Sequence, residues 1–337
     1  MPPPPQSSLV RAFRVAYDGR PYHGYQRQPD VPTVADALLD ALVSLDVLDR
    51  STTSNATADS EDETSPRPDD DRARPDDDGA RSDDDGARPD DSRTRPTPPG
   101  YAAAGRTDAG VSALAQTVAF SAPAWLTPRA LNSRLPDTVS AWASADVADD
   151  FHATHDATRR TYCYHLFLSD GDRARAKAAT EALSGTHDFH NLTPDESGTE
   201  RTLSCELLTE PLGNEAARTG GGDALTLRVA ADGFPRQLVR RLVTVVRSVA
   251  TGAASLDRID RLLAPEPVDG PAGVQPAPPE PLVLADVHYP EVTFEPDREA
   301  VERTRAVFRR QRRRGVVTAR VAETVLDGVP ETDERRE

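Results

Sequence analysis

The sequence Gly-Arg-Thr-Asp-Ala-Gly-Val at residues 105–111 places one carboxylate between two glycines, with an arginine two residues before it. Glycine lets a backbone turn sharply and approach a ligand closely, so this loop should present Asp108 rather than bury it. We expect Arg106 to keep that carboxylate ionised, because a nearby opposite charge favours the charged form. An ionised, presented carboxylate can act as a nucleophile or a base, although the same pattern is also typical of a tight turn with a capping Asp.

The segments around this loop predict an α+β fold. Thr33 with Asp36 three residues later is a capping-box pattern, and it predicts the start of a helix with an apolar stripe. Alternating apolar residues predict strands over 9–17, 117–121, 139–147, 162–168, 203–208, 224–230 and 282–288. Further helices are expected at 127–128 onward, 175–183, 235–250 and 298–314. This alternation in short mixed units favours two α+β modules around antiparallel sheets over a doubly wound parallel sheet.

The predicted organisation has three parts and one insertion. We expect an N-terminal α+β module over 8–148, a C-terminal α+β module over 149–292 and an arginine-rich helical tail over 293–337. The insertion, residues 51–99, contains imperfect seven-residue repeats, and residues 59–95 carry 15 acidic residues and 7 arginines, half of the chain's net charge of −16. Such a segment cannot bury enough apolar surface to offset its ordering entropy, so we expect a disordered acidic insertion on the surface of the first module.

The composition indicates a soluble protein of a salt-rich cytoplasm. The 337 residues contain 56 Asp and Glu against 40 Lys and Arg, and the only lysine is Lys177. Many carboxylates with almost no lysine resemble the proteins of salt-in halophiles, since carboxylates stay hydrated where salt screens their repulsion. No apolar run is long enough to span a membrane, residues 1–5 do not read as a signal peptide, and two cysteines are too few for a disulfide framework.

Three other groups of residues leave alternatives open. The Tyr22–Gln28 loop has the aromatic and amide groups that recognise unpaired RNA bases, or it is a turn whose rings pack on the sheet. Tyr162 and Tyr164 share one strand face, where either could stack on a base or both could fill the core. Arg236, Arg240 and Arg247 are expected on one face of the 235–250 helix, to bind phosphate or simply to be solvated. The pairs His152-x-x-His155 and His187-x-x-His190 do not have the spacing of common zinc sites.

Several motifs in one order carry a more specific resemblance. They are Tyr17-Asp18-Gly19, Gly24-Tyr25-Gln26-Arg27-Gln28, residues 105–111, Leu131-Asn132-x-x-Leu135-Pro136, Phe151-His152-Ala153, Tyr162-x-Tyr164 and Phe234 with Leu238-Val239-Arg240. Together they resemble the TruA-type tRNA pseudouridine synthases over residues 9 to about 290, apart from the insertion. The resemblance implies two RRM/ferredoxin-like modules around an extended, mostly antiparallel sheet with a central cleft, usually in a homodimer.

The resemblance also implies an activity and a set of site residues. The expected reaction converts uridine to pseudouridine at positions 38, 39 and 40 of the tRNA anticodon stem-loop, with neither cofactor nor metal. Asp108 matches the catalytic aspartate, Tyr162 the tyrosine that stacks on the target base, Arg240 the basic residue that pairs with the aspartate, and Arg106 the arginine that helps to turn out the nucleotide. Ser112 departs from the family, which often has His there. The alternative is a non-catalytic RNA-binding protein that uses the same cleft.

Overall fold

A computed structural model describes residues 8–48, 96–168, 171–209, 223–268 and 273–329. The predicted acidic insertion at 51–99 lies outside these residues except for 96–99, so its expected disorder stays a prediction.

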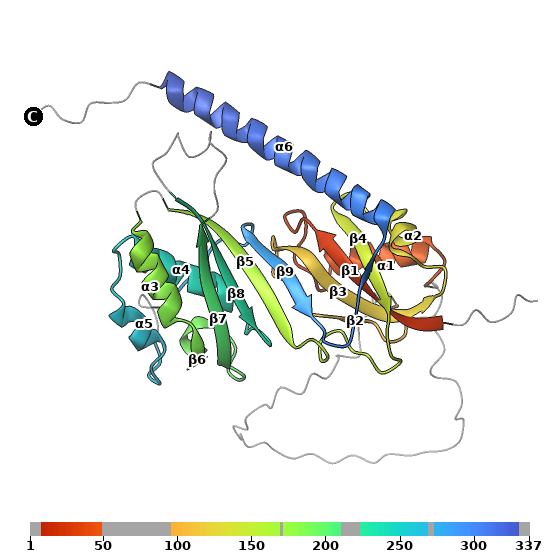
Figure 1. Cartoon of the computed structure of the whole chain (residues 1–337), viewed down its shortest axis with the longest axis horizontal. Helices are drawn as coiled ribbons and strands as arrows, with labels where there is room; N and C mark the ends of the chain where they lie inside the picture. The colour runs from red at the N-terminus through yellow and green to blue at the C-terminus, as the bar shows by residue number, and fades with distance from the viewer. Residues whose placement is uncertain (1–7, 49–95, 169–170, 210–222, 269–272, 330–337) are drawn as a thin grey trace, which may run out of the picture.

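One large open sheet forms the centre of the protein (Figure 1). Its strand order is β10-β4-β1-β3-β9-β5-β8-β7-β6, and the short β2 pairs with β3. Each neighbouring pair is antiparallel except β3 and β9, which are parallel. The strands are β1 (Ser8–Tyr17), β2 (Ala102–Ala103), β3 (Ser112–Pro123), β4 (Val139–Asp146), β5 (Arg159–Leu168), β6 (Gly185–Asp188), β7 (Glu200–Thr209), β8 (Asp223–Ala231), β9 (Leu282–His288) and β10 (Glu295–Pro296). The predicted α+β class and the extended, mostly antiparallel sheet are therefore confirmed.

Six α-helices and one short 3-10 helix, η1 (His190–Leu192), accompany the sheet in the described part of the chain. The α-helices are α1 (Val34–Ser44), α2 (Pro128–Asn132), α3 (Arg173–Ala182), α4 (Leu238–Ala250), α5 (Asp257–Leu262) and α6 (Arg298–Gly328). The first begins where the capping pattern predicts, because Thr33 Oγ1 accepts the backbone N–H of Asp36 and donates to its carboxylate.

Two apolar cores flank the middle of the sheet. One lies between α1 and strands β1, β3 and β4, with Phe13, Tyr17 and Phe120 fully buried. The other packs α3, α4 and α5 against β5, β7 and β8, around Phe189 and Leu242. Strand β9 joins the halves, because it pairs with β3 on one side and β5 on the other. The module boundaries at residues 148 and 292 remain predictions.

Two predicted helices differ by three residues or more from those observed. Helix α4 starts at Leu238 rather than at residue 235, because Gln237 is in the left-handed region with φ of 59°. Arg236 therefore lies before the helix. The prediction that it shares a helical face with Arg240 and Arg247 was wrong. Helix α6 continues 14 residues beyond the predicted end at Arg314, through Gly315 and a run of β-branched residues that have low helix propensity.

Candidate active site

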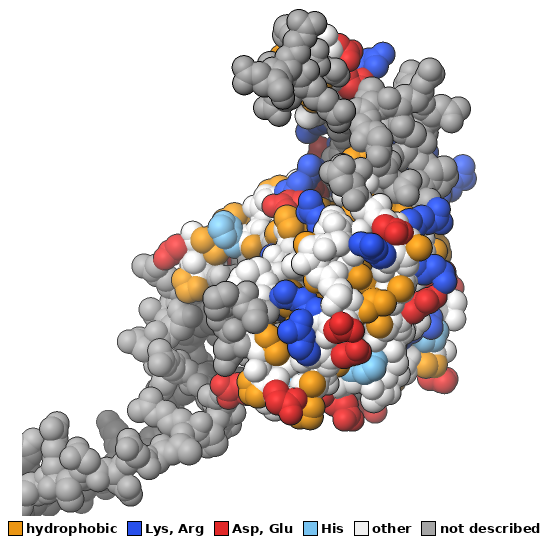
Figure 2. Space-filling model, turned by 90° about the vertical axis from the view of Figure 1, so that its left-hand side faces the viewer, with side chains coloured by type: hydrophobic (Ala, Val, Ile, Leu, Met, Phe, Trp, Pro, Cys, Tyr) orange, Lys and Arg blue, Asp and Glu red, His pale blue; other side chains and the backbone are white. Residues whose placement is uncertain are grey.

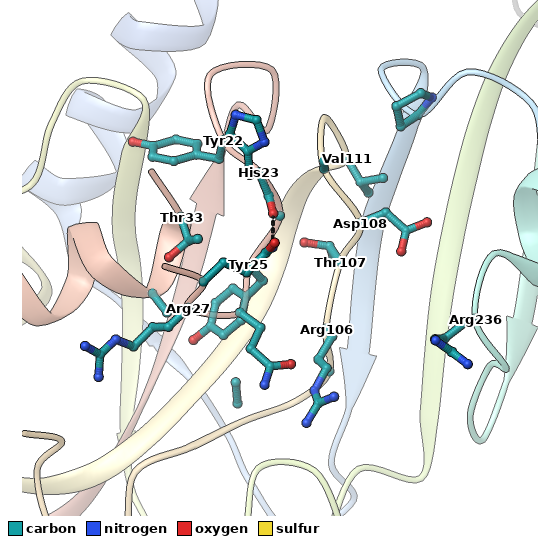
Figure 3. A pocket seen from close by; sticks show the side chains of 18 of the residues that line it. Tyr22, His23, Tyr25, Arg27, Thr33, Arg106, Thr107, Asp108, Val111 and Arg236 are labelled. Atoms are coloured by element: carbon teal, nitrogen blue, oxygen red, sulfur yellow. Dashed lines mark hydrogen bonds between the residues drawn. The ribbon is translucent and has the colours of Figure 1, made fainter. Parts of the chain in front are cut away.

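A cleft of about 1930 Å³ lies over the middle of the sheet and is lined by residues of both halves. From the first half come α1, the loop at 22–33 and the loop at 105–111. From the second come Tyr162 of β5, residues 234–240 and Pro279 with Leu282 (Figure 3 shows part of this lining). The volume is about twice the upper end of small-molecule pockets, which hold about 300–1,000 Å³. The cleft is therefore large enough for a macromolecular segment.

Asp108 is held in this cleft by an arginine from the opposite half. Arg240 Nη1 donates to Asp108 Oδ2 over 2.9 Å, and Arg240 Nε donates to the carbonyl oxygen of Ala277 over 2.6 Å. The Arg240 side chain is 13% exposed and that of Asp108 is 37% exposed. The contact with Ala277 holds the Arg240 side chain in place, so Arg240 can fix one oxygen of the Asp108 carboxylate. The rest of the carboxylate remains accessible from the cleft.

Arg106, which the sequence suggests as the charge partner of Asp108, does not pair with it. Arg106 and Asp108 leave the same loop in different directions (Figure 3), and among the described residues only Arg240 forms an ion pair with Asp108. Arg106 is exposed and lines the cleft without an ion pair to any described residue. Its guanidinium is therefore available to a ligand that enters the cleft.

The loop at 19–25 braces the loop that carries Asp108. Tyr25 N–H donates to the carbonyl oxygen of Thr107 over 3.0 Å, and Gly110 N–H donates to that of Tyr22 over 3.2 Å. Thr107 is fixed again through its hydroxyl, which lies 2.7 Å from the buried Tyr17 hydroxyl. Tyr25 itself is buried, so in this loop the packing alternative is correct for Tyr25, and base recognition stays open only for its exposed neighbours.

Two side chains that sequence reasoning did not assign also hold this loop. Ser112, at the position where the resembled family often has His, accepts the backbone N–H of Gly19 over 3.0 Å. The fully buried Gln116 donates from Nε2 to the carbonyl oxygen of Gly105 over 2.9 Å. The sequence contains one signal for the role of Gln116, which is a Gln in the middle of an apolar strand. Such a side chain is buried with its strand, and a buried amide requires hydrogen-bond partners.

Gly24 is required where these two loops meet. Its φ is +96°, and a Cβ added there would lie 2.8 Å from the carbonyl oxygen of Thr107. We expect Gly24→Ala to lower the free energy of unfolding by roughly 1–3 kcal/mol and to lower activity by displacing the Asp108 loop. Gly100 is the matched control, because it has a φ of +70° but open space around an added Cβ. Denaturant unfolding and activity assays of both variants test this; equal losses of activity would contradict the bracing role of Gly24.

Tyr162 lies at the boundary of the cleft, whereas Tyr164 is buried in the core. The Tyr162 ring meets Phe234 edge to face at a centroid distance of 5.2 Å. Burial and the negative charge of Asp108 raise the pKa of Tyr162 to about 12. The phenol therefore stays neutral near the carboxylate, and one ring of the predicted pair remains available for stacking.

The turn before α4 is fixed by long-range contacts. Arg236 contacts the carboxylate of Asp195 twice: its backbone N–H donates to Oδ2 over 2.7 Å, and its guanidinium forms an ion pair. The carbonyl oxygen of Arg236 accepts the Thr193 hydroxyl over 3.1 Å. Desolvation raises the pKa of Asp195, but these hydrogen bonds outweigh it and hold the pKa below its usual value. Arg236 thus lines the cleft at a fixed position.

The two histidine pairs have other partners. The rings of His152 and His155 lie 4.2 Å apart between centroids and are tilted by 34°, and His152 Nδ1 accepts the backbone N–H of Thr154 over 3.2 Å. His187 Nε2 lies 3.0 Å from the carbonyl oxygen of Ser184. Over the described ranges, no group of three or more His, Cys, Asp or Glu side chains is placed to hold a metal ion. Within the same ranges, no helix has the length and apolar character needed to cross a membrane.

Comparison with known proteins identifies the family. A protein of Haloarcula marismortui called tRNA pseudouridine synthase A is 48% identical over 95% of this chain and 100% of its own length. This chain belongs to the tRNA pseudouridine synthase A family. A Natronomonas pharaonis protein of the same name is 48% identical over 93% of this chain and 97% of its own. The family described as tRNA pseudouridine synthase also matches residues 179–290. A chain of the archaeal box H/ACA sRNP Nop10-Cbf5 complex, at 13% identity over 44% of this chain and a TM-score of 0.23, is too weakly similar to support an argument.

Proposed function

We propose that this protein converts uridine to pseudouridine at positions 38, 39 and 40 of the tRNA anticodon stem-loop, with Asp108 as the catalytic carboxylate. The observation that carries the proposal is the ion pair between Asp108 and Arg240. The two residues come from opposite halves of the sheet, and both line the cleft. Membership of the tRNA pseudouridine synthase A family supports the reaction and the tRNA substrate.

The reaction needs an oriented carboxylate. The C1′–N1 glycosidic bond breaks, the uracil turns, and a C1′–C5 bond forms; C5 loses its proton and N1 gains one, so atoms and electrons balance. A carboxylate fixed through one oxygen by Arg240 keeps its other oxygen free for the substrate. That oxygen can attack as a nucleophile or remove a proton as a base. Both roles depend on the same position of Asp108.

A uridine in a stem must first leave the helix. Extruding a base costs a few kcal/mol of pairing and stacking. We infer that the exposed Arg106 helps to displace the nucleotide and that the Tyr162 ring, held edge-on by Phe234, stacks on the extruded uracil. Base–aromatic stacking contributes about 1–3 kcal/mol, which offsets much of this cost.

Two replacements of Tyr162 separate its ring from its hydroxyl. We expect Tyr162→Leu to lower kcat/KM by roughly 5- to 150-fold, the equivalent of losing 1–3 kcal/mol of stacking. Tyr162→Phe keeps the ring and should retain most of the activity. Steady-state kinetics with one tRNA substrate measures both. If the Phe variant were as impaired as the Leu variant, the hydroxyl rather than the ring would carry the function.

Tritium release tests the proposed function directly. tRNA that carries uridine labelled at C5 should release tritium in molar KCl, because C5 loses its hydrogen only when it bonds to C1′. Three tRNA transcripts are compared, in each of which only one of positions 38, 39 and 40 is a uridine. Each should yield pseudouridine at that position, detected by carbodiimide-dependent primer-extension stops. Pseudouridine formed only at other positions would refute the assignment to the anticodon stem-loop. Binding of tRNA without release of tritium would favour the non-catalytic alternative.

We further propose a cytoplasmic homodimer adapted to high salt. The strongly acidic composition supports the salt adaptation, as does the haloarchaeal origin of the relatives. Light scattering after size exclusion in molar KCl should give twice the chain mass of 36.4 kDa. A single-chain mass under conditions that preserve activity would rule out the dimer.

A further inference from the structure

Helix α6 concentrates positive charge in an otherwise acidic protein. Between residues 303 and 322 the sequence contains eight arginines and no Asp or Glu, although the chain has a net charge of −16. The helix has 31 residues and is therefore about 47 Å long at 1.5 Å per residue. It extends from α2 and β4 along the long axis of the molecule (Figure 1). The arginines are thus distributed along one long helix.

The first half of α6 is anchored beside the rim of the cleft. The anchoring contacts join Thr304 Oγ1 to Ser140 Oγ (2.7 Å), Arg310 Nη2 to Asp137 Oδ2 (2.9 Å) and Gln311 Nε2 to Asp18 Oδ2 (3.0 Å). Asp18 comes directly before the loop at 19–25, which braces residues 105–111. Tyr22 of the same loop lines the cleft, and its hydroxyl lies 2.6 Å from that of Thr138. The helix therefore has a fixed position relative to Asp108.

Four arginines of α6 form a face that points away from two of these anchors, Thr304 and Gln311, while the third anchor, Arg310, lies at its edge. Arg305, Arg309, Arg312 and Arg313 lie at i, i+4, i+7 and i+8, so they share one side of the helix. The anchors Thr304 and Gln311 lie on the opposite side. All four arginines are exposed, and their side chains have no hydrogen bond or ion pair to any residue that the structure describes. We call these four residues the outer arginine face.

We propose that the outer arginine face binds backbone phosphates of the tRNA outside the cleft. This inference rests on the proposed function and adds a second contact surface to it. A polyanion meets net repulsion from a chain of charge −16, and Asp36 and Asp40 line the cleft itself. Uncompensated guanidinium groups are the groups that reverse this repulsion locally, because their planar donors match phosphate oxygens. Phosphate contacts of this kind position a nucleic acid without reading its sequence.

Two triple variants with the same charge change test the proposal. The first is Arg305→Gln with Arg309→Gln and Arg312→Gln, because Gln removes the charge and preserves helix propensity. The control is Arg173→Gln with Lys177→Gln and Arg261→Gln, on the exposed surfaces of α3 and α5. The end of the molecule shown in Figure 2, where α3 and α5 lie in Figure 1, has acidic and basic side chains interspersed. It is therefore a suitable comparison for the acid-free stretch of α6.

The measurement is the affinity for full-length tRNA as a function of KCl, over the range in which circular dichroism shows a native fold. Each lost phosphate contact should reduce the slope of log K against log [KCl] by about 0.9, so the α6 variant should lose about 2–3 from its slope. Its single-turnover rate at saturating tRNA should stay within about twofold of wild type, because no residue of the cleft is changed. The control should keep the wild-type slope.

Three results would overturn the inference. The first is an unchanged slope in the α6 variant, and the second is an equal reduction in both variants, which would assign the effect to net charge. The third is binding of wild type, but not of the α6 variant, to anionic phospholipid vesicles with unchanged tRNA slopes, which would assign the face to a lipid surface. Tritium release by wild type is measured separately, so a failure of the proposed function is distinguishable from a failure of this inference.

Discussion

Asp108→Asn is expected to reduce tritium release by about 10⁴-fold or more, the scale seen when a catalytic nucleophile or base is removed. Asn has the shape of Asp and keeps an oxygen that can accept the hydrogen bond from Arg240, but it can act neither as a nucleophile nor as a base. The fold and tRNA affinity should therefore change little. The measurement is single-turnover tritium release at saturating tRNA, with circular dichroism and filter binding on the same preparations.

Asp146→Asn is the matched control for this prediction. Asp146 is also an arginine-paired carboxylate, with Arg11 Nε 2.6 Å from its Oδ1, but it lies on β4 and does not line the cleft. The same chemical change there should leave the release rate within severalfold of wild type. Substantial release by the Asp108→Asn variant, or an equal loss in both variants, would remove Asp108 from its catalytic role.

The features predicted correctly from the sequence are those encoded locally. The capping pattern of Thr33 and Asp36 places the start of α1, because all of its partners lie within one helical turn. Period-two alternation likewise identifies β5 and β8: Tyr164 and Leu168 of β5 are buried, as are Leu225, Leu227 and Val229 of β8. The two-residue strands β2 and β10 were missed, because such short pairings with a longer strand leave no periodic signal.

The features that local sequence patterns did not predict depend on contacts between distant residues. The partner of Asp108 is 132 positions away, and the sequence neighbour Arg106 points elsewhere. The α4 boundary is set by Asp195, which holds the Arg236 backbone across 41 positions. Local propensity carries no information about either pairing. The motif resemblance did suggest Arg240, because it compares whole constellations rather than neighbouring residues.

Arg240→Gln is expected to lower the single-turnover rate by about 10²-fold or more, even at saturating tRNA. The change removes the donor to Asp108 and the Nε donor to Ala277, so it frees both the carboxylate and the loop that supports Arg240. A displacement of about 1 Å in a reacting group is enough for a loss of this size. Arg240→Lys should recover only part of the rate, because an ammonium does not reproduce the fork that reaches both partners at once.

Arg236→Gln distinguishes this effect from the loss of a positive charge in the cleft. Arg236 lines the same cleft four residues earlier but pairs with Asp195, which is not a cleft residue. Its replacement should weaken tRNA binding and raise KM, while the rate at saturation remains within a few-fold of wild type. Arg240→Gln should instead lower kcat. If both variants changed only KM, Arg240 would act as a phosphate contact, and the ion pair with Asp108 would not be required to orient the carboxylate.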